Sequence, residues 1–186
     1  MSIDLITKIE LFIFILILGP TMYAMLRGAP FVPTEMEQVR RMLKAAQLKP
    51  GMKVYDLGSG DGRLVHTAAN KYHANAVGYE FSPLVWVWSK FLSLFWRSKA
   101  KLRYGNFWTQ DFSDADVLVC YLLTDSMERM HQKIWPQLKP GTLVISNAFV
   151  MKNLKPWKKM ERDRDRNLGP IWIYKKEKPQ KQARTR

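Results

Sequence analysis

Residues 54–64 read VYDLGSGDGRL, and this stretch decides the fold. An apolar pattern typical of a strand carries Asp56, and Gly58, Gly60 and Gly62 follow it at strict alternation. Glycine in the interior of a helix or strand is destabilising, so three glycines in five positions indicate a turn with special backbone demands. The stretch therefore predicts a short strand, a tight glycine turn, and a helix that begins near Arg63.

The same alternation of strand and helix continues on both sides of this turn. Apolar segments predict strands over 52–57, 74–80, 101–107, 115–123, 142–149 and 169–176, and helices are predicted over 63–71, 84–100 and 124–138. The region 150–170 is polar and shows no clear pattern. Buried strands alternating with helices are typical of an α/β protein with a largely parallel sheet. We predict a Rossmann-like, doubly wound sheet.

The glycine turn lies where doubly wound folds bind nucleotides, directly after the first strand. Its spacing is G-x-G-x-G, and Arg63 stands where a dinucleotide fingerprint has its third glycine, which disfavours NAD and FAD. No Lys-Ser or Lys-Thr follows the glycines, so a P-loop is excluded. Glu80 ends the second strand, where a carboxylate accepts both hydroxyls of a ribose. A ribose ligand without a phosphate cradle fits S-adenosylmethionine.

Several motifs together resemble a known enzyme class. VYDLGSGDGR, GYE and LKPGTLVI make residues 50–150 resemble class I S-adenosylmethionine-dependent methyltransferases. FVPT, the Ser-Pro after GYE, the Trp-rich helix and the Phe-Trp pair after the third strand are similar to one lysine methyltransferase family over residues 31–150. That family includes the mitochondrial enzymes acting on the ATP synthase c-subunit and on the adenine nucleotide translocase. The resemblance implies S-adenosylmethionine as cofactor and a mostly parallel, seven-stranded methyltransferase sheet.

The resemblance also implies site residues. Asp56 would face the methionine end of the cofactor, and Glu80 would take the ribose. Asn106 stands where family members often have Asp, and its amide oxygen would accept from the adenine amino group. The predicted cofactor set is Asp56, Gly58, Ser59, Gly60, Gly62, Glu80, Phe81, Asn106 and Phe107, and the predicted acceptor contacts are Phe31, Thr34 and Tyr121. The sequence shows no general base, so it predicts no catalytic residue.

Two further alternatives stay open around these residues. Thr34, with Glu37 three positions on, also fits a capping box at the start of a helix. Residues 84–97 carry too many aromatic side chains for one helix face, so they fit either the core or a bilayer interface. The three histidines lack metal-ligand spacing and Cys120 is the single cysteine, so neither a metal site nor an intramolecular disulfide is predicted.

The N-terminal segment predicts a membrane anchor over residues 1–27. Residues 11–26 carry no charge, and extension back to Leu5 gives a helix of about 33 Å, close to the thickness of a bilayer core. A signal peptide fits less well, because the first ten residues are net acidic. Basic residues follow the segment, so the domain is predicted on the cytoplasmic side. The start lacks transit-peptide character, which favours a prokaryotic inner membrane.

The sequence predicts that the rest of the chain divides into a linker and capping helix over 28–51, the methyltransferase domain over 52–176, and a basic disordered tail over 177–186. The formal net charge of +14 favours an anionic lipid surface or another polyanion as a neighbour. Nucleic acid is disfavoured as the acceptor, because no N-P-P-Y or D-P-P-Y motif follows the fourth strand.

The leading hypothesis is a membrane-anchored methyltransferase acting on lysine of a membrane-associated protein. Its alternatives are a methyltransferase for a lipid, a quinone or another small amphiphile, a nucleic-acid methyltransferase, and a binding module without catalysis.

Overall fold

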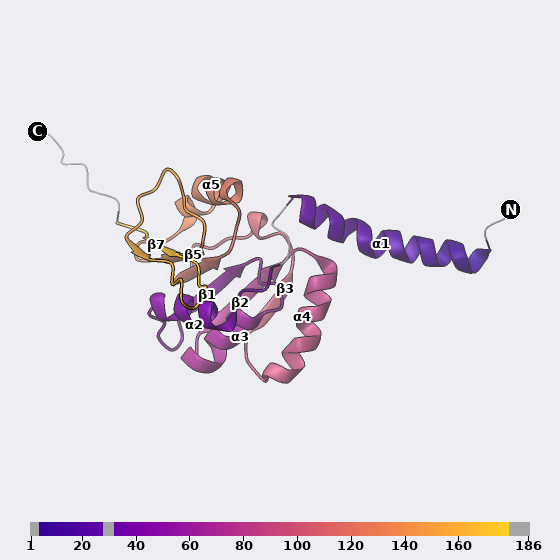
Figure 1. Cartoon of the computed structure of the whole chain (residues 1–186), viewed down its shortest axis with the longest axis horizontal. Coiled ribbons are helices and arrows are strands. Elements are labelled where there is room, and N and C mark those ends of the chain that lie inside the picture. Colours follow the sequence, from indigo (N-terminus) through magenta and orange to yellow (C-terminus); the bar gives the residue numbers. More distant parts are fainter. Residues whose placement is uncertain (1–3, 28–31, 179–186) are drawn as a thin grey trace, which may run out of the picture.

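The structure is a computed structural model and describes residues 4–27 and 32–178. Its helices are α1 (Leu5–Arg27), α2 (Met36–Ala45), α3 (Arg63–Tyr72), α4 (Pro83–Trp96) and α5 (Thr124–Lys133), with short 3₁₀ helices η1 (Phe107–Thr109) and η2 (Trp135–Gln137). Its strands are β1 (Lys53–Leu57), β2 (Asn75–Glu80), β3 (Lys101–Tyr104), β4 (Val117–Cys120), β5 (Leu143–Asn147), β6 (Lys158–Met160) and β7 (Ile171–Lys175). Figure 1 shows the sheet between its helices, with α1 extending away from it.

One seven-stranded sheet organises the domain in the order β3-β2-β1-β4-β5-β7-β6. The first five strands of the chain pair in parallel, whereas β7 is antiparallel to β5 and β6 is antiparallel to β7. The strand order reverses between β1 and β4, which is where open α/β sheets bind ligands at the carboxyl ends of their strands. The predicted mostly parallel α/β fold is confirmed.

The two faces of the sheet carry separate hydrophobic cores. Val54, Val117 and Val119 belong to the core that also contains buried residues of α2 and α3. Their strand neighbours Leu118 and Cys120 belong to the core that contains buried residues of α5. This alternation follows from the strand repeat of two residues, and it fixes which side chains reach each face.

The structure corrects several boundaries. The region 150–170, which had no predicted strand, contains β6. The third strand ends at Tyr104, and the predicted helix 124–138 ends at Lys133, before Pro136 in the 3₁₀ turn η2. Proline lacks the N–H that a continuing helix needs, which accounts for the early end.

The predicted capping box at α2 is wrong. The N-cap residue is Glu35, no side chain caps the helix there, and Glu37 pairs with Arg166 at 2.8 Å. The carbonyl of Thr34 accepts from Arg63 instead.

The predicted single-pass membrane localisation is also overturned. A helix forms over Leu5–Arg27, but among the described residues no helix combines the length and hydropathy that a bilayer crossing requires. Lys8 and Glu10 interrupt its apolar run near the beginning.

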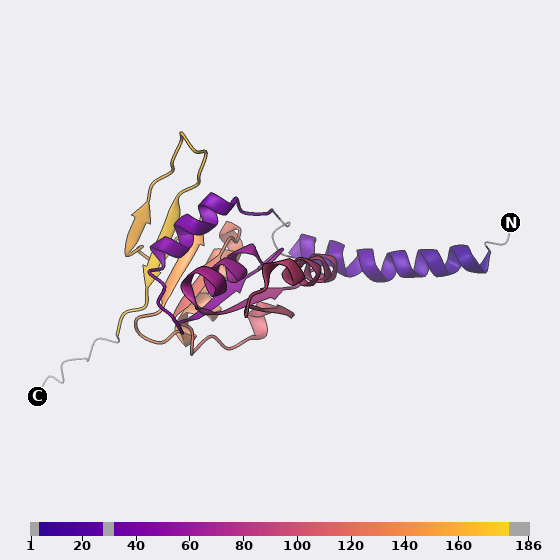
Figure 2. The same ribbon diagram turned by 90° about the horizontal axis from the view of Figure 1, so that it is seen from below.

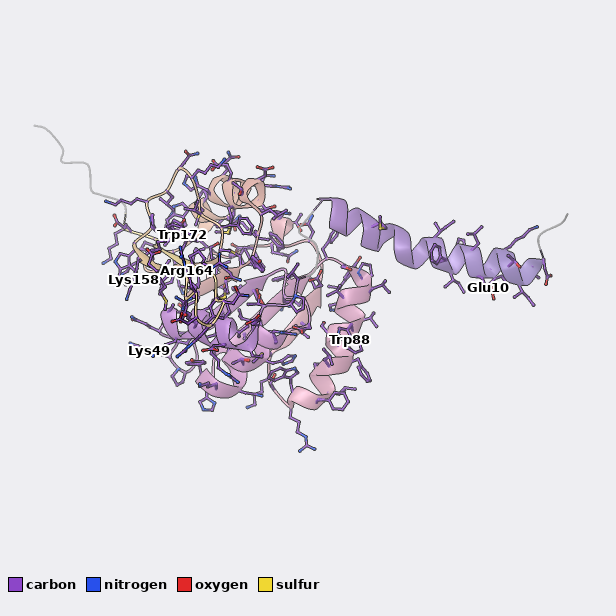
Figure 3. All side chains as sticks on the ribbon, viewed as in Figure 1. Glu10, Lys49, Trp88, Lys158, Arg164 and Trp172 are labelled. Atoms are coloured by element: carbon purple, nitrogen blue, oxygen red, sulfur yellow. The ribbon has the colours of Figure 1, made fainter. Side chains whose placement is uncertain are left out.

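The Trp-rich helix α4 is largely uncovered. Ser89 is the one buried residue of this helix. Trp88, Phe91 and Phe95 expose 51%, 49% and 72% of their surface. Figure 3 labels Trp88 on this helix. Trp96 is half-buried and stacks on His66 at 5.4 Å. The interpretation of these aromatic residues as core therefore fails for the outer face of α4.

Candidate active site

The glycine turn lies at the carboxyl end of β1 and is bonded to the end of β2. Gly58, Gly60 and Gly62 have φ of 85°, 56° and 83°, the left-handed region that other residues rarely adopt. The N–H groups of Gly58 and Ser59 both donate to the carbonyl of Tyr79, at 3.0 and 2.9 Å. The turn therefore needs glycine for its backbone shape and is held beside Glu80 by main-chain bonds.

Glu80 is held by backbone N–H groups. Its Oε2 accepts from Gly60 N at 3.0 Å and its Oε1 accepts from Ser82 N at 2.8 Å. Burial raises the pKa of the carboxyl, and these hydrogen bonds oppose that shift. The backbone of Phe81 also bonds to this carboxyl, so three of its about four acceptor positions are used within the protein. The fixed carboxylate thus keeps acceptor capacity beside the turn for a ribose hydroxyl.

Asp56 is a buried carboxyl on β1. Burial, and then the charges of Glu80 and Asp61, raises its pKa to about 7. Asp61 forms an ion pair with Arg63 at 2.5 Å. A cation placed beside Asp56 would restore its charged form, because an opposite charge favours ionisation. This environment fits the ammonium group at the methionine end of S-adenosylmethionine.

The segment after β3 forms an aromatic wall. Asn106 caps η1, and its Oδ1 accepts from Trp108 N at 3.0 Å, leaving one lone pair for the predicted adenine contact. The rings of Phe107 and Trp108 lie 4.6 Å apart. The guanidinium of Arg129 lies 4.4 Å from the Trp108 ring centroid. Sequence reasoning missed Arg129, because α5 is distant in the chain and carries no motif.

Phe81, also in the predicted cofactor set, follows Glu80 directly. Its ring is parallel to that of Tyr104, with centroids 6.5 Å apart. The Phe81 ring therefore lies against the end of β3.

The ends of β4 and β5 lie on the other side of the glycine turn and carry a second aromatic pair. The rings of Tyr121 and Phe149 are 6.0 Å apart. The backbone between β5 and Phe149 is braced: Ala148 N donates to Pro170 O at 2.9 Å, and Ala148 O accepts from Trp172 Nε1 at 3.1 Å. These bonds hold Ala148 at φ 63°, an unfavourable value for a residue other than glycine.

The predicted acceptor residues are only partly brought together. Tyr121 lies in the aromatic pair, whereas Thr34 contacts the glycine turn's Arg63 through its carbonyl. Phe31 lies outside the described residues. Phe149 completes the pair, and its place at the end of the fifth strand predicts it, with Phe31 and Tyr121, as a wall of the acceptor site.

The described residues fit the cofactor that the sequence predicts. The left-handed glycines, the held carboxylate of Glu80 and the buried carboxyl of Asp56 together suit an adenosine that carries a cationic tail. Ser59 of the predicted set instead packs its side chain against Gly78 of β2.

Comparisons with known proteins agree with this geometry. The ANTKMT methyltransferase domain family matches residues 56–158. A protein-lysine N-methyltransferase of Saccharolobus islandicus is 35% identical over 153 residues, covering 78% of this chain and 92% of that protein. The lysine N-methyltransferase of the ATP synthase c-subunit from Rattus norvegicus is 32% identical over 150 residues, covering 78% of this chain and 65% of that protein.

A similar solved structure also supports S-adenosylmethionine as the cofactor. An RNA methyltransferase from Salinibacter ruber, in complex with S-adenosyl-L-homocysteine, matches with a TM-score of 0.71 and 32% identity over 81% of this chain and 98% of that one. The glycine turn, the carboxylate at the end of β2 and these relatives together lead to one conclusion: the chain belongs to the ANTKMT methyltransferase domain family and is an S-adenosylmethionine-dependent methyltransferase.

Proposed function

We propose that this enzyme transfers a methyl group to the side-chain amine of lysine in a protein. The observation that carries the proposal is the 35% identity to the Saccharolobus islandicus protein-lysine N-methyltransferase, which extends over 92% of that relative. Two other relatives are named for protein targets, the ATP synthase c-subunit and the adenine nucleotide translocase. These names support a protein acceptor over a lipid or quinone. That the target is membrane-associated stays a prediction.

The described residues support transfer by positioning. When bound, S-adenosylmethionine supplies a methyl group that its sulfonium already activates. Glu80 and the glycine turn would orient the adenosine, and Asp56 would hold the ammonium group of the cofactor. Orientation of this kind is worth about 7–11 kcal/mol of the barrier in well-aligned reactions. Catalysis therefore needs no strongly acidic or basic side chain.

The acceptor amine must lose a proton before it attacks. The Tyr121–Phe149 pair would cover the apolar stem of a lysine and exclude water from its amine, which lowers the amine pKa. The proton lost from the amine would leave to solvent, and the bound cofactor would supply the methyl group to the free nitrogen, with S-adenosylhomocysteine as the leaving group. The aromatic pair thus has a chemical role as well as a steric one.

One observation favours a second acceptor class. The similar Salinibacter ruber protein is described as an RNA methyltransferase, and this chain has a net charge of +14. Basic proteins bind nucleic acid through counterion release, which gives steep salt dependence. RNA is therefore the alternative that the assay must separate from protein.

The test is label transfer. The full chain and methyl-labelled S-adenosylmethionine are incubated with a lysate of the source cells, and protein, lipid and RNA are then separated. Label in protein that amino-acid analysis recovers as methyl-lysine supports the proposal. Label confined to RNA or to lipid contradicts it. A Glu80→Ala variant serves as the control and should leave every fraction unlabelled.

A further inference from the structure

Arg63 occupies an unfavourable place for a cation. It is the first residue of α3, and that helix has no acidic residue in its first turn. The N-terminal end of a helix carries partial positive charge, which disfavours a base there. Local helix stability therefore does not explain an arginine at this position, and its contacts must.

The guanidinium of Arg63 joins two segments. Its Nε donates to both carboxylate oxygens of Asp61, at 3.0 and 2.8 Å. The Nε side of the guanidinium is therefore bonded to the glycine turn. Its Nη1 donates to the carbonyl of Thr34 at 2.8 Å. A lysine ammonium retains the charge but lacks the planar fork that serves both partners together. The contact therefore depends on arginine.

Thr34 leads directly into α2, and α2 is bonded to the acceptor side of the site. Gln38 Nε2 donates to Asn147 Oδ1 at 2.6 Å and to the carbonyl of Gly169 at 3.1 Å. Arg41 Nη1 donates to the same carbonyl at 2.8 Å. A carbonyl only accepts, so the amide nitrogen of Gln38 must face Gly169 and its orientation is fixed.

These hydrogen bonds of Gln38 and Arg41 connect α2 to the end of β5, where the Tyr121–Phe149 pair lies. Asn147 ends β5 two residues before Phe149, and Gly169 lies in the loop between β6 and β7. Figure 2 shows α2 alongside the strands that lead into this loop. A continuous set of hydrogen bonds thus runs from the glycine turn through Arg63 and Thr34 to α2, and from α2 to the end of β5.

We propose that Arg63 is a positioning residue: the glycine turn, once ordered by the cofactor, holds α2 and the acceptor side through the Arg63–Thr34 bond. Cofactor binding then reduces the motion of α2, although α2 contributes no predicted contact to the cofactor. The proposal concerns the order of α2 and holds whether the acceptor is protein or RNA.

Hydrogen–deuterium exchange of the full chain tests this, with S-adenosylhomocysteine as the probe. In the unmodified protein the probe should slow exchange in residues 57–63 and also in 36–45. In Arg63→Lys the charge beside Asp61 is retained, so the Kd of the probe should change by less than about threefold. Protection of 57–63 should then persist while protection of 36–45 is lost.

Arg166→Lys is the matched control. Arg166 also contacts α2, through an exposed ion pair with Glu37 at 2.8 Å, but it has no described bond to the glycine turn. Its probe-dependent protection of 36–45 should equal that of the unmodified protein. The proposal is overturned if the probe still protects 36–45 in Arg63→Lys, or if it gives no such protection in the unmodified protein. It is also overturned if the Kd of the probe for Arg63→Lys rises about tenfold. Such a rise would indicate that the change removes a charge-assisted contact at the cofactor.

Discussion

The carboxyl edge of the sheet has two halves that are stabilised by different contacts. At the ends of β1 and β2, the carboxyl of Asp56 is buried, and the partly buried carboxyl of Glu80 accepts from the backbone N–H groups of Gly60 and Ser82. At the ends of β4 and β5, the partly exposed rings of Tyr121 and Phe149 form a pair, and the backbone just before Phe149 is held by a hydrogen bond from Trp172 of β7. We expect the β1–β2 half to recognise its ligand by charge and hydrogen bonding, and the β4–β5 half to recognise its ligand by shape and apolar contact.

This difference indicates which kind of substitution should affect each half most. Changing one atom in a buried polar network leaves its partners without hydrogen bonds, which costs more than the bond itself contributed. Trimming one ring of an exposed pair removes contact area but leaves no polar group stranded. The β1–β2 half should therefore respond sharply to small changes and to pH, and the β4–β5 half should respond to changes in size.

The largest expected effect is that of Glu80→Ala. The change removes the acceptor of two backbone N–H groups and both predicted ribose contacts, so the Kd of S-adenosylhomocysteine should rise about 100-fold or more. Isothermal titration calorimetry measures this directly. Glu37→Ala on the exposed side of α2 is the control and should leave the Kd unchanged. An unchanged Kd for Glu80→Ala would remove the basis for treating β1–β2 as the cofactor half.

Asp56→Asn tests the β1–β2 half through the pH dependence of the free energy of unfolding. The native pKa of Asp56 is about 7, above its ordinary value of 3.8, so between these values the folded protein binds a proton that the unfolded chain releases. The free energy of unfolding of the cofactor-free protein should therefore fall as pH rises from about 4 to 7. Asp56→Asn lacks this loss, so at pH 8 it should be more stable than the unmodified protein by up to about 4 kcal/mol.

Urea denaturation at pH 5 and pH 8 measures the difference between the two proteins. An equal gap at both values of pH would show that Asp56 is not the group responsible. The same variant should bind S-adenosylhomocysteine more weakly, because the ligand's ammonium loses its counter-charge.

Tyr121→Ala tests the β4–β5 half. Loss of one aromatic wall should slow methyl transfer about tenfold, in line with the loss of roughly 1–1.5 kcal/mol of aromatic contact. The Kd of S-adenosylhomocysteine should stay close to that of the unmodified protein, because no described polar contact of the cofactor half involves Tyr121. Single-turnover rates with the labelled acceptor and calorimetry give the two values. A rise of about tenfold in the Kd of S-adenosylhomocysteine for Tyr121→Ala would show that the β4–β5 half also binds the cofactor.

The smallest effect is expected outside the site, on α4. Phe95 is 72% exposed, so Phe95→Ser should change the free energy of unfolding by less than about 0.5 kcal/mol. Phe112→Ser makes the same change at a fully buried position and should destabilise the protein by about 3–5 kcal/mol. Urea denaturation compares the two. A large loss for Phe95→Ser would mean that the outer face of α4 is covered in solution.

The predictability of the two halves from sequence follows the same division. The glycine turn was predictable because positive φ restricts the residue type, and Glu80 because a strand end next to that turn fixes its place. These signals are local in the chain. The parallel sheet followed from the alternation of apolar segments with helices.

The remaining parts depend on contacts between distant segments. Arg129 reaches Trp108 from α5, and Arg63 reaches Thr34 from α3, without a short motif that announces either contact. β6 was missed because its residues Lys158–Met160 are mostly exposed and show no apolar alternation. The capping box at Thr34 failed because Arg63 takes the carbonyl of that residue and the helix begins one residue later than the motif implies.

The contact between Ser59 and Gly78 restricts how this enzyme's sequence can change. A Cβ built on Gly78 would lie 2.5 Å from Ser59 Cβ, a distance that real side chains do not reach. A library that randomises β2 therefore loses nearly every clone at position 78 unless position 59 becomes glycine as well. The two positions form one unit for directed evolution, even though they lie 19 positions apart in the sequence. Designers who wish to retune cofactor affinity should vary the pair together.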